Sequence, residues 1–423
     1  MDTTMPIDTL RNRVAALEAR DDTAEQTLSR VEPLLSQIRA TPPFDISFAD
    51  SLGLPVHLTV RTSDLRDVPF HTLREWGSFD LTCTHAGKGL TPEQSRLSCI
   101  MEAIERYSAS YHDIEGRTTV GAYHDIEASA IDPRDFCLPP GVDFSPNREL
   151  VWYRGDNLFT RQTVCLPIDF VLMDIPDSAY PFAGFESKRL GFFFSNGLAA
   201  GTRIEEALVS GICEVVERDA QYRVAHRMEP LPTELDLGGE KDFIPWLRLF
   251  DEHRLSLRAF FLQNVKGFYS VIVTSWDDYC RVLVTGTAAD TNIHRATHSA
   301  IMELVQQRAF MFFSSWKTHR EYFPIVRYIR ERVHPNSYEP SPPPTFWTEQ
   351  CHEPVCMGDC REAIPRNTSR ILEALERDHQ VIGLDLTHPA VGIPVARVVI
   401  SGLRNGYLDY QPTLSFIKES APH

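Results

Sequence analysis

One pattern of polar residues occurs twice in this chain of 423 residues, and it limits the folds that the sequence can adopt. The segments 98–106 and 210–218 both begin with serine, continue with glutamate four residues later and again three residues after that, and end with arginine. Around the second segment the apolar residues recur at helical spacing, so we predict a helix with one apolar face. Its opposite face carries Glu206, Ser210, Glu214 and Glu217, with Arg218 at the edge.

A third segment keeps part of the same pattern. It begins at Ser299 and retains Glu303, but has Gln306 and Gln307 where the other two segments have glutamate and arginine. Similar segments at intervals along a chain indicate duplicated structural units. We therefore predict an α+β fold in which mixed or antiparallel sheets are covered by the glutamate-bearing helices, with an internal pseudo-repeat relating residues of about 80–190 to those of about 191–320.

The repeated glutamates have two interpretations. On one helix alone, a solvated acidic face would be the simpler one, since like charges at this spacing repel by only a few tenths of a kcal/mol. Core packing, however, gives no reason to repeat the polar positions. Carboxylates are the oxygen ligands that Mg²⁺ prefers when phosphates complete its coordination, and arginine suits phosphate oxygens. We therefore interpret the helices as walls of a nucleotide and metal site without a P-loop.

Composition excludes several classes of function. The formal net charge of −16 argues against a nucleic-acid partner, whose phosphates require a basic surface. No apolar run is long enough to span a membrane, and the N-terminal residues do not resemble a secretory signal, so we expect a cytoplasmic protein. The nine cysteines show no disulfide framework. Three of them, Cys351, Cys356 and Cys360, cluster near His352, but their spacing matches none of the common metal-ligand patterns.

The remaining elements are predicted from periodicity and from cap residues. Residues 1–45 have a helical pattern, with Asp22 or Thr23 as a cap, and Thr91 with Gln94 has the form of a capping box that opens the first glutamate helix. Thr202 with Glu205 has the same form before the second. Residues 85–89 are expected to form a loop, and residues 335–344 a proline-rich loop or linker. A third glutamate helix is predicted after residues 286–290, and another helix at 364–377. Further strands are predicted at 46–61, 79–85, 149–153, 164–173, 256–262, 269–276, 281–286, 381–386 and 394–400.

Taken together, these motifs resemble the YcaO family. The resemblance rests on Gly87-Lys88-Gly89 before the first glutamate segment, on residues 196–201 before the second, on Glu303 with Gln306 and Arg308, and on the closing strands at 383–387 and 392–400. It covers roughly residues 20–405, and the combination is far more specific than any one of its short motifs. It implies a catalytic domain over residues 46–405, preceded by the helical segment 1–45 and followed by a tail at 406–423.

The resemblance also implies an activity. YcaO enzymes use ATP and Mg²⁺ to activate a backbone amide of a peptide or protein: a nucleophile adds to the amide carbon, and the amide oxygen takes the γ-phosphoryl group. A neighbouring Cys, Ser or Thr side chain gives an azoline ring, whereas sulfide delivered by a TfuA-type partner gives a thioamide. Phosphoryl transfer depends mainly on charge neutralisation and in-line positioning, which agrees with the residues found here.

Carried over by position, the resemblance assigns roles to specific residues. Glu102, Glu105, Glu214 and Glu217 would be Mg²⁺ ligands, and Glu105, Glu217, Arg106 and Arg218 would carry catalysis. The nucleotide would be bound by the two arginines together with Arg20, Thr27, Lys88, Ser98, Thr202, Glu206, Glu303, Gln306 and Arg308. Lys88 has a second interpretation as a solvated turn residue, and His298 is expected to pack in the interior rather than to act as a base.

Two departures from the family pattern bear on the reaction. Ala199 and Thr202 stand where the family commonly has serine and asparagine, and residues 412–423 lack the proline-alternating tail typical of azoline formers. We therefore expect thioamide formation or another non-azoline modification, with an azoline-forming cyclodehydratase as the alternative. Residues 1–40 resemble helices rather than a leader-peptide-binding module, so a partner protein is expected to recruit the substrate.

Two alternatives come from other classes of protein. An inactive scaffold that binds a peptide or partner would predict broken glutamate patterns, whereas both copies are intact here. A kinase or ligase of another family is disfavoured, because the P-loop and kinase motifs are absent from the sequence. By family habit, the chain is expected to form a homodimer.

Overall fold

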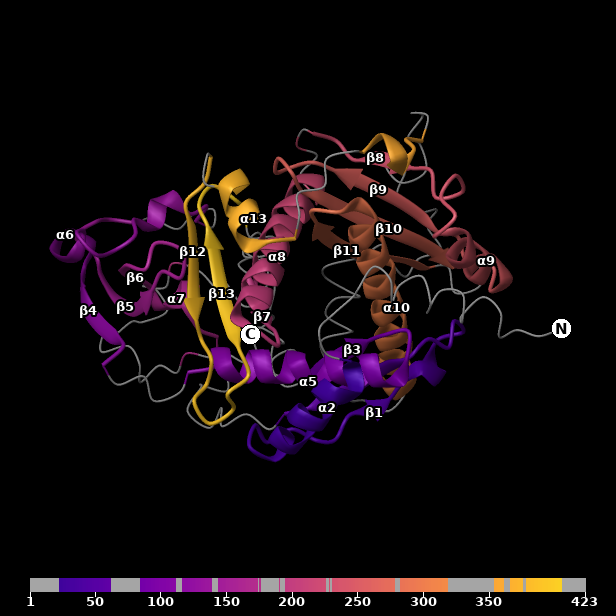
Figure 1. Cartoon of the computed structure of the whole chain (residues 1–423), viewed down its shortest axis with the longest axis horizontal. Coiled ribbons are helices and arrows are strands. Elements are labelled where there is room, and N and C mark those ends of the chain that lie inside the picture. Colours follow the sequence, from indigo (N-terminus) through magenta and orange to yellow (C-terminus); the bar gives the residue numbers. More distant parts are fainter. Residues whose placement is uncertain are drawn as a thin grey trace, which may run out of the picture. The chain divides into compact units, whose positions relative to one another are not determined.

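The computed structural model divides the chain into two compact units, each assembled from separate segments (Figure 1). The first comprises Met1–Arg61, Cys83–Ala103 and Met228–Ile364, and the second comprises Thr62–Thr82, Ile104–Arg227 and Pro365–His423. The boundaries of these units differ from those expected for the pseudo-repeat, which stays a prediction. The structure describes residues 23–61, 84–111, 116–138, 144–173, 175, 190, 195–225, 228, 230–277, 282–318, 354–360, 366–375 and 378–404.

A small antiparallel sheet precedes the first glutamate helix. It consists of β1 (Phe44–Asp45), β2 (Val56–Val60) and β3 (Thr84–Lys88), in that order. The loop predicted at residues 85–89 was wrong, because Thr84–Lys88 pairs with β2 in a continuous register. Helix α5 (Pro92–Ala109) follows, and its predicted capping box is confirmed by reciprocal hydrogen bonds between Thr91 and Gln94.

The largest sheet of the first unit is an antiparallel meander. It has the order β11-β10-β9-β8, and the long helix α10 (Ile293–Thr318) packs on β10 and β11 (Figure 1). The strands are β8 (Thr233–Leu235), β9 (Arg258–Leu262), β10 (Tyr269–Asp277) and β11 (Val282–Asp290), and α9 (Ile244–Glu252) contributes Trp246 and Phe250 to the core. The meander confirms the prediction, although β11 runs to Asp290 instead of ending at Gly286.

In the second unit, the helix with the second glutamate segment covers a three-stranded antiparallel sheet. Helix α8 (Ile204–Ala225) packs on β7 (Leu198–Ala200) and β13 (Val395–Ile400), and β12 (Val381–Asp385) completes the sheet. The two layers approach closely at Gly211, where an added Cβ would lie 2.7 Å from the carbonyl oxygen of Gly197. Glycine at this point therefore lets the helix backbone reach the sheet.

The other sheet of the second unit consists of β4 (Thr118–Ala122), β5 (Glu149–Asp156) and β6 (Thr163–Pro167). The strand predicted for residues 164–173 was wrong beyond Pro167, where the short helix α7 (Ile168–Val171) begins. The predicted helix near residues 364–377 is confirmed as α13 (Thr368–Leu375). Helices and antiparallel sheets together confirm the α+β class.

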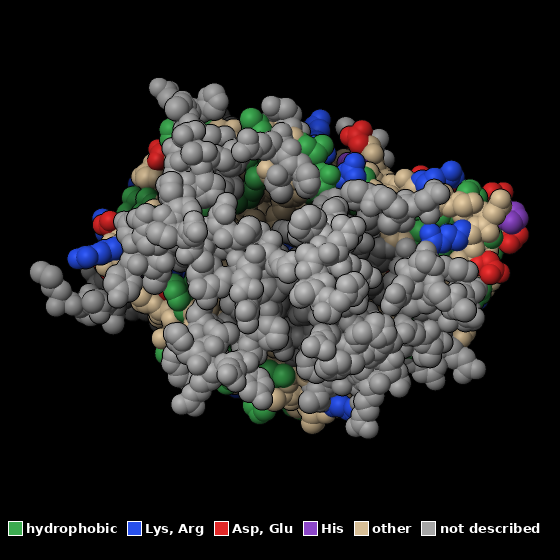
Figure 2. All heavy atoms as spheres, turned by 180° about the vertical axis from the view of Figure 1, so that it is seen from behind, with side chains coloured by type: hydrophobic (Ala, Val, Ile, Leu, Met, Phe, Trp, Pro, Cys, Tyr) green, Lys and Arg blue, Asp and Glu red, His purple; other side chains and the backbone are tan. Residues whose placement is uncertain are grey.

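The first described segment is the helix α2 (Ala24–Val31), whose predicted Thr23 cap is confirmed by reciprocal bonds with Gln26. The remaining short elements are η1 (Glu32–Ser36), η2 (Ser47–Ala49), α6 (Tyr123–Ile126), η4 (Pro133–Asp135) and η8 (Met357–Asp359). Among the described helices, none has both the length and the apolar character needed to cross a bilayer. Figure 2 shows acidic and basic side chains of described residues next to one another near the edges of the visible face.

Candidate functional site

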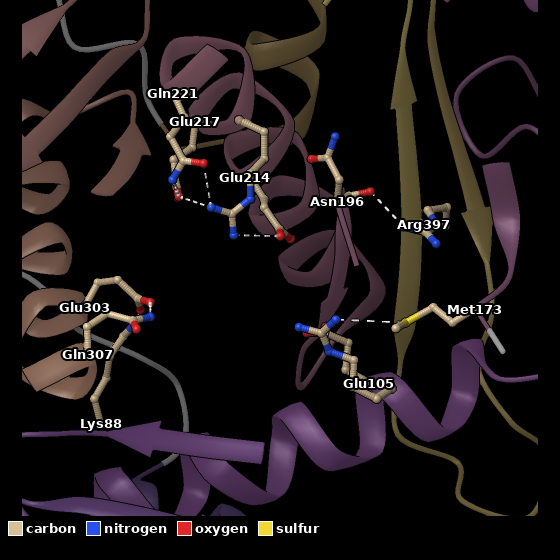
Figure 3. Close-up of polar contacts among 12 residues, drawn as sticks. Lys88, Glu105, Met173, Asn196, Glu214, Glu217, Gln221, Glu303, Gln307 and Arg397 are labelled. Carbon is tan, nitrogen blue, oxygen red and sulfur yellow. Dashed lines mark hydrogen bonds and ion pairs between the residues drawn. The ribbon is translucent and has the colours of Figure 1, made fainter. Parts of the chain in front are cut away.

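In the second unit, the acidic face of α8 is closed by its own arginine. Arg218 donates a hydrogen bond from Nη2 to Glu214 Oε1 at 3.3 Å and another from Nη1 to Glu217 Oε1 at 2.8 Å. Gln221, one turn after Glu217, donates to the same Glu217 oxygen at 3.2 Å and accepts from Arg218 at 3.1 Å (Figure 3). The two carboxylates that the sequence placed one turn apart therefore share one cation.

The first glutamate helix repeats one part of this arrangement, the pairing of an arginine with the glutamate before it. Arg106 of α5 lies 3.3 Å from Glu105 Oε1 through its Nε atom, and its Nη1 contacts the sulfur of Met173 at 3.9 Å. The side chains of Glu105 and Arg106 are 15% and 19% exposed. Both arginine–glutamate pairs are therefore largely buried, with a small part of each side chain exposed.

A buried arginine, Arg397, lies in strand β13 of the same unit. Its guanidinium is fully buried and binds two backbone carbonyls, that of Val171 at the end of α7 through Nε at 3.0 Å and that of Asn196 through Nη1 at 2.7 Å (Figure 3). Burial lowers the pKa of Arg397 to about 10, so the group stays protonated at neutral pH. A fixed positive charge therefore lies within this unit's core.

Electrostatic interactions connect these groups across three elements. Burial raises the pKa of Glu214, and the positive charges of Arg218, Arg106 and Arg397 oppose that rise. The charge of Arg397 is in turn influenced by Glu214, Arg106 and Glu105. Charged residues at the end of α5 and on α8 therefore influence one another electrostatically within the second unit.

The first unit holds a separate group of site residues. Lys88 of β3 forms an ion pair with Glu303 Oε2 of α10, and Gln307 donates from Nε2 to Glu303 Oε1 at 2.9 Å (Figure 3). Glu102 of α5 accepts a hydrogen bond from the backbone N–H of Ala86 at 3.2 Å, on β3, which among the described strands pairs with β2 alone. This carboxylate therefore satisfies part of an exposed strand edge.

Several residues predicted at the nucleotide site have other partners. Arg308 is buried and binds both Asp50, at 2.9 Å, and Asp277, at 3.1 Å, so its guanidinium ties α10 to neighbouring elements. Thr27 is buried and donates to the carbonyl of Thr23. The environments of both differ from those of solvent-accessible phosphate ligands, and neither enters the site proposed below.

The cap of α8 differs in detail from its prediction. The backbone N–H and the hydroxyl of Thr202 both donate to Glu206 Oε2 at 2.8 Å, so Glu206 and not Glu205 completes the cap, because the helix begins at Ile204. Ser98 and Gln306 are half-buried on their helices. Arg20 lies outside the described residues.

Sequence reasoning missed three residues of these groups. Gln221 and Gln307 each lie four residues after a predicted glutamate, a spacing that could have indicated their contacts. Arg397 lies in a run of apolar strand residues, where a lone arginine is itself a signal, since buried charges require partners. Which partners it has depends on the fold.

The donor set fits a hard cation that phosphate also coordinates. In the described part of the chain, no group of three or more His, Cys, Asp or Glu side chains is close enough to hold a metal ion on its own. Mg²⁺ commonly takes one or two carboxylates together with phosphate oxygens and water. Asn196 adds a buried Oδ1 atom to which no described residue donates a hydrogen bond. Of the predicted cysteine cluster, Cys356 is exposed and Cys360 is half-buried, and Cys351 lies outside the described residues.

The family model for YcaO cyclodehydratases, described as binding ATP and Mg²⁺, matches residues 86–404. The chain belongs to the YcaO family. It is accordingly an ATP-dependent enzyme with ATP and Mg²⁺ as cofactors. This match begins within β3 and includes all three glutamate helices and the closing strands, which are the segments that carried the resemblance in the sequence.

Known YcaO proteins share this fold. The YcaO protein of Methanopyrus kandleri, solved with AMPPCP and Mg²⁺, has a TM-score of 0.64 and 23% identity, with 93% of this chain and 94% of that chain covered. A heterocyclase solved with substrate and cofactor has a TM-score of 0.71 and 20% identity over 91% of this chain, which spans about half of that protein's length, 53%. A protein of Rhizobium leguminosarum bv. trifolii from the region 3′ of tfuA is 28% identical over 47% of this chain and 42% of its own length.

Proposed function

We propose that this YcaO protein activates a backbone amide of a peptide or protein and that its product is a thioamide. The observation that carries the proposal is the charged group of the second unit, in which Glu214 and Glu217 share Arg218 while Arg106 and Arg397 act on Glu214. Oxygen donors for a cation and arginines for phosphate are what phosphoryl transfer requires. The relative from the tfuA region supports sulfide as the nucleophile.

The acidic residues of this group would bind the metal cation, and its arginines would bind phosphate. Glu105, Glu214 and Glu217 would supply the Mg²⁺ ligands, one or two of them together with phosphate oxygens and water, while Arg106 and Arg218 would turn from their glutamates toward phosphate oxygens. When bound, ATP supplies the γ-phosphoryl group and Mg²⁺ offsets its negative charge. The amide oxygen would take that group, with ADP as the leaving group, as hydrosulfide adds to the amide carbon. Departure of the phosphorylated oxygen as phosphate and loss of the sulfur-bound proton would leave a carbon–sulfur double bond.

The test combines the purified protein, ATP, Mg²⁺, sulfide, candidate peptides and a TfuA-type partner. Phosphate release would be measured together with the intact mass of the peptide. We expect ATP turnover coupled to replacement of one oxygen by sulfur. Loss of one water from a peptide with Cys, Ser or Thr would instead support the cyclodehydratase alternative, which the family description favours. Nucleotide binding without turnover under any condition would support the inactive scaffold.

Replacement of Glu214 by glutamine tests the assigned site directly. The amide keeps the size of the side chain but removes the negative charge that would hold the cation, so we expect loss of ATP hydrolysis with an unchanged circular dichroism spectrum. Glu373→Gln on α13 is the matched control, because this glutamate is exposed and forms a surface ion pair with Arg370. Turnover by Glu214→Gln at the wild-type rate would contradict the assignment.

A further inference from the structure

The ion pair between Lys88 and Glu303 in the first unit is fixed from both sides. Lys88 alternates with Gly87 along β3, so the two residues face opposite sides of the sheet. An added Cβ at Gly87 would lie 2.1 Å from the backbone nitrogen of Cys99, and one at Gly89 would lie 2.5 Å from that of Ser95. Close packing against α5 therefore holds the strand on one side, and α10 lies against β3 as well.

Both oxygens of Glu303 are engaged in this structure. Oε2 pairs with the Lys88 ammonium, and Oε1 accepts from the amide of Gln307. The side chains of Lys88 and Glu303 are 29% and 25% exposed, so ions in solution can reach the pair. A partly exposed pair of this kind stabilises a protein weakly, and a stronger ligand for either charge can separate it.

The two partners have complementary preferences for the same ligand. Glu303 is a hard oxygen donor suited to Mg²⁺, and Lys88 is a compact point charge suited to phosphate. A magnesium nucleotide supplies both opposite charges at once. Binding of a magnesium nucleotide would therefore require little free energy to separate Lys88 from Glu303, because each charge would exchange one partner for another.

We propose that Lys88 is the internal counter-ion of Glu303 and that a magnesium nucleotide separates the pair, with Glu303 turning to the cation and Lys88 to a phosphate oxygen. This inference rests on the proposed use of ATP and Mg²⁺. It assigns Lys88 two opposite effects. Without nucleotide, the Lys88 ammonium competes with a metal cation for the carboxylate of Glu303. With nucleotide, the same ammonium strengthens nucleotide binding.

The test is one substitution measured against two ligands. Lys88→Met removes the charge but keeps the length of the side chain. Mn²⁺ binding without nucleotide would be followed by electron paramagnetic resonance, and binding of AMPPCP with Mg²⁺ by calorimetry. We expect Lys88→Met to bind Mn²⁺ about fivefold more tightly than the wild-type protein and the nucleotide about fivefold or more weakly, on the scale of one partly exposed ion pair.

Two variants control for other causes. Lys266→Met removes one positive charge from an exposed turn of the same unit, and we expect both affinities to match those of the wild-type protein. Lys88→Arg keeps the charge, and it should restore wild-type Mn²⁺ binding. The variants' thermal unfolding would verify that each is folded.

The outcomes separate the inference from the proposed function. Opposite shifts of the two affinities support the counter-ion role. If both affinities shift in the same direction, or if Lys88→Met leaves Mn²⁺ binding unchanged, the counter-ion role is wrong. The proposed function would remain, provided that the wild-type protein binds the nucleotide. A wild-type protein that binds no nucleotide would instead remove the proposed function on which the inference rests.

Discussion

At the scale of single residues, two buried arginines of the described chain, Arg308 and Arg397, have defined partners. Arg397 is the clearest case, because its fully buried guanidinium binds the carbonyls of Val171 and Asn196. Its replacement by methionine would leave both buried carbonyls without these donors. We expect a loss of about 3 kcal/mol in the free energy of unfolding, measured by urea denaturation, from unsatisfied acceptors and from a carboxylate deprived of a nearby positive charge.

Two comparisons show whether this loss comes from burial. Arg370→Met removes an exposed arginine, 66% accessible, from a surface pair on α13, and we expect a change of less than about 0.5 kcal/mol. Arg397→Lys keeps a positive charge and should recover part of the stability. Equal losses for Arg397→Met and Arg370→Met would show that the two carbonyl contacts contribute nothing measurable.

His298 on α10 is buried beside Trp246, with ring centroids 5.6 Å apart, as expected for a packing residue. Burial lowers its pKa from 6.5 to about 4. The unfolded chain binds a proton at this histidine more readily than the folded protein does. The stability that the protein has with His298 neutral is therefore complete above about pH 6.5 and is lost as the pH falls toward 4. We expect His298→Phe to lose less stability than the wild-type protein between pH 7 and 5, by on the order of 1–2 kcal/mol.

The measurement is urea denaturation at a series of pH values. His253→Phe, which makes the same substitution at an exposed histidine at the end of α9, is the control. It should leave the pH dependence as in the wild-type protein. Parallel pH curves for His298→Phe and the wild-type protein would refute the buried histidine as a source of acid sensitivity.

At the scale of elements, glycines decide how closely helices approach their sheets. Gly286 in β11 faces α10, and an added Cβ would lie 2.2 Å from the backbone oxygen of Ala300. Neither backbone can move without displacing the helix that carries Glu303. We therefore expect Gly286→Ala to lower the free energy of unfolding by about 2–3 kcal/mol, measured by urea denaturation.

Gly121→Ala is a matched control. Gly121 also lies within a strand, β4, but an added Cβ there would meet no atom within 4 Å. This variant should be neutral or slightly stabilising, since alanine restricts the unfolded chain more than glycine does. If both variants had the same stability, close approach of α10 to β11 would not be the reason for glycine at position 286.

At the scale of the whole molecule, ligand binding should appear as added stability. A ligand that binds only the folded state stabilises it in proportion to the logarithm of its concentration, by about 2.7 kcal/mol at a hundredfold excess over Kd. We expect AMPPCP with Mg²⁺ to raise the melting temperature and EDTA to abolish the increase. UMP, which lacks a triphosphate, is the control, and an equal increase with and without Mg²⁺ would argue against carboxylate-held metal.

Much of this structure follows from local sequence. The helical periods, the caps at Thr23 and Thr91 and the alternating apolar runs predicted the glutamate helices, the meander and the closing strands, because these signals act over a few residues. The errors fell at boundaries. Residues 85–88 contain small and polar residues that are typical of a loop, yet pairing with β2 makes them a strand.

The sequence by itself determined the family of this protein, since the repeated glutamates and arginines that carry the resemblance are visible in one chain. The tertiary structure decided which of these groups meet. Arg308 is conspicuous in the sequence but binds Asp50 and Asp277, whereas Arg397 lies in an apolar strand and acts on Glu214. These partners lie far apart along the chain, and only the packing of sheets and helices, which depends on every residue of the core, brings them within reach.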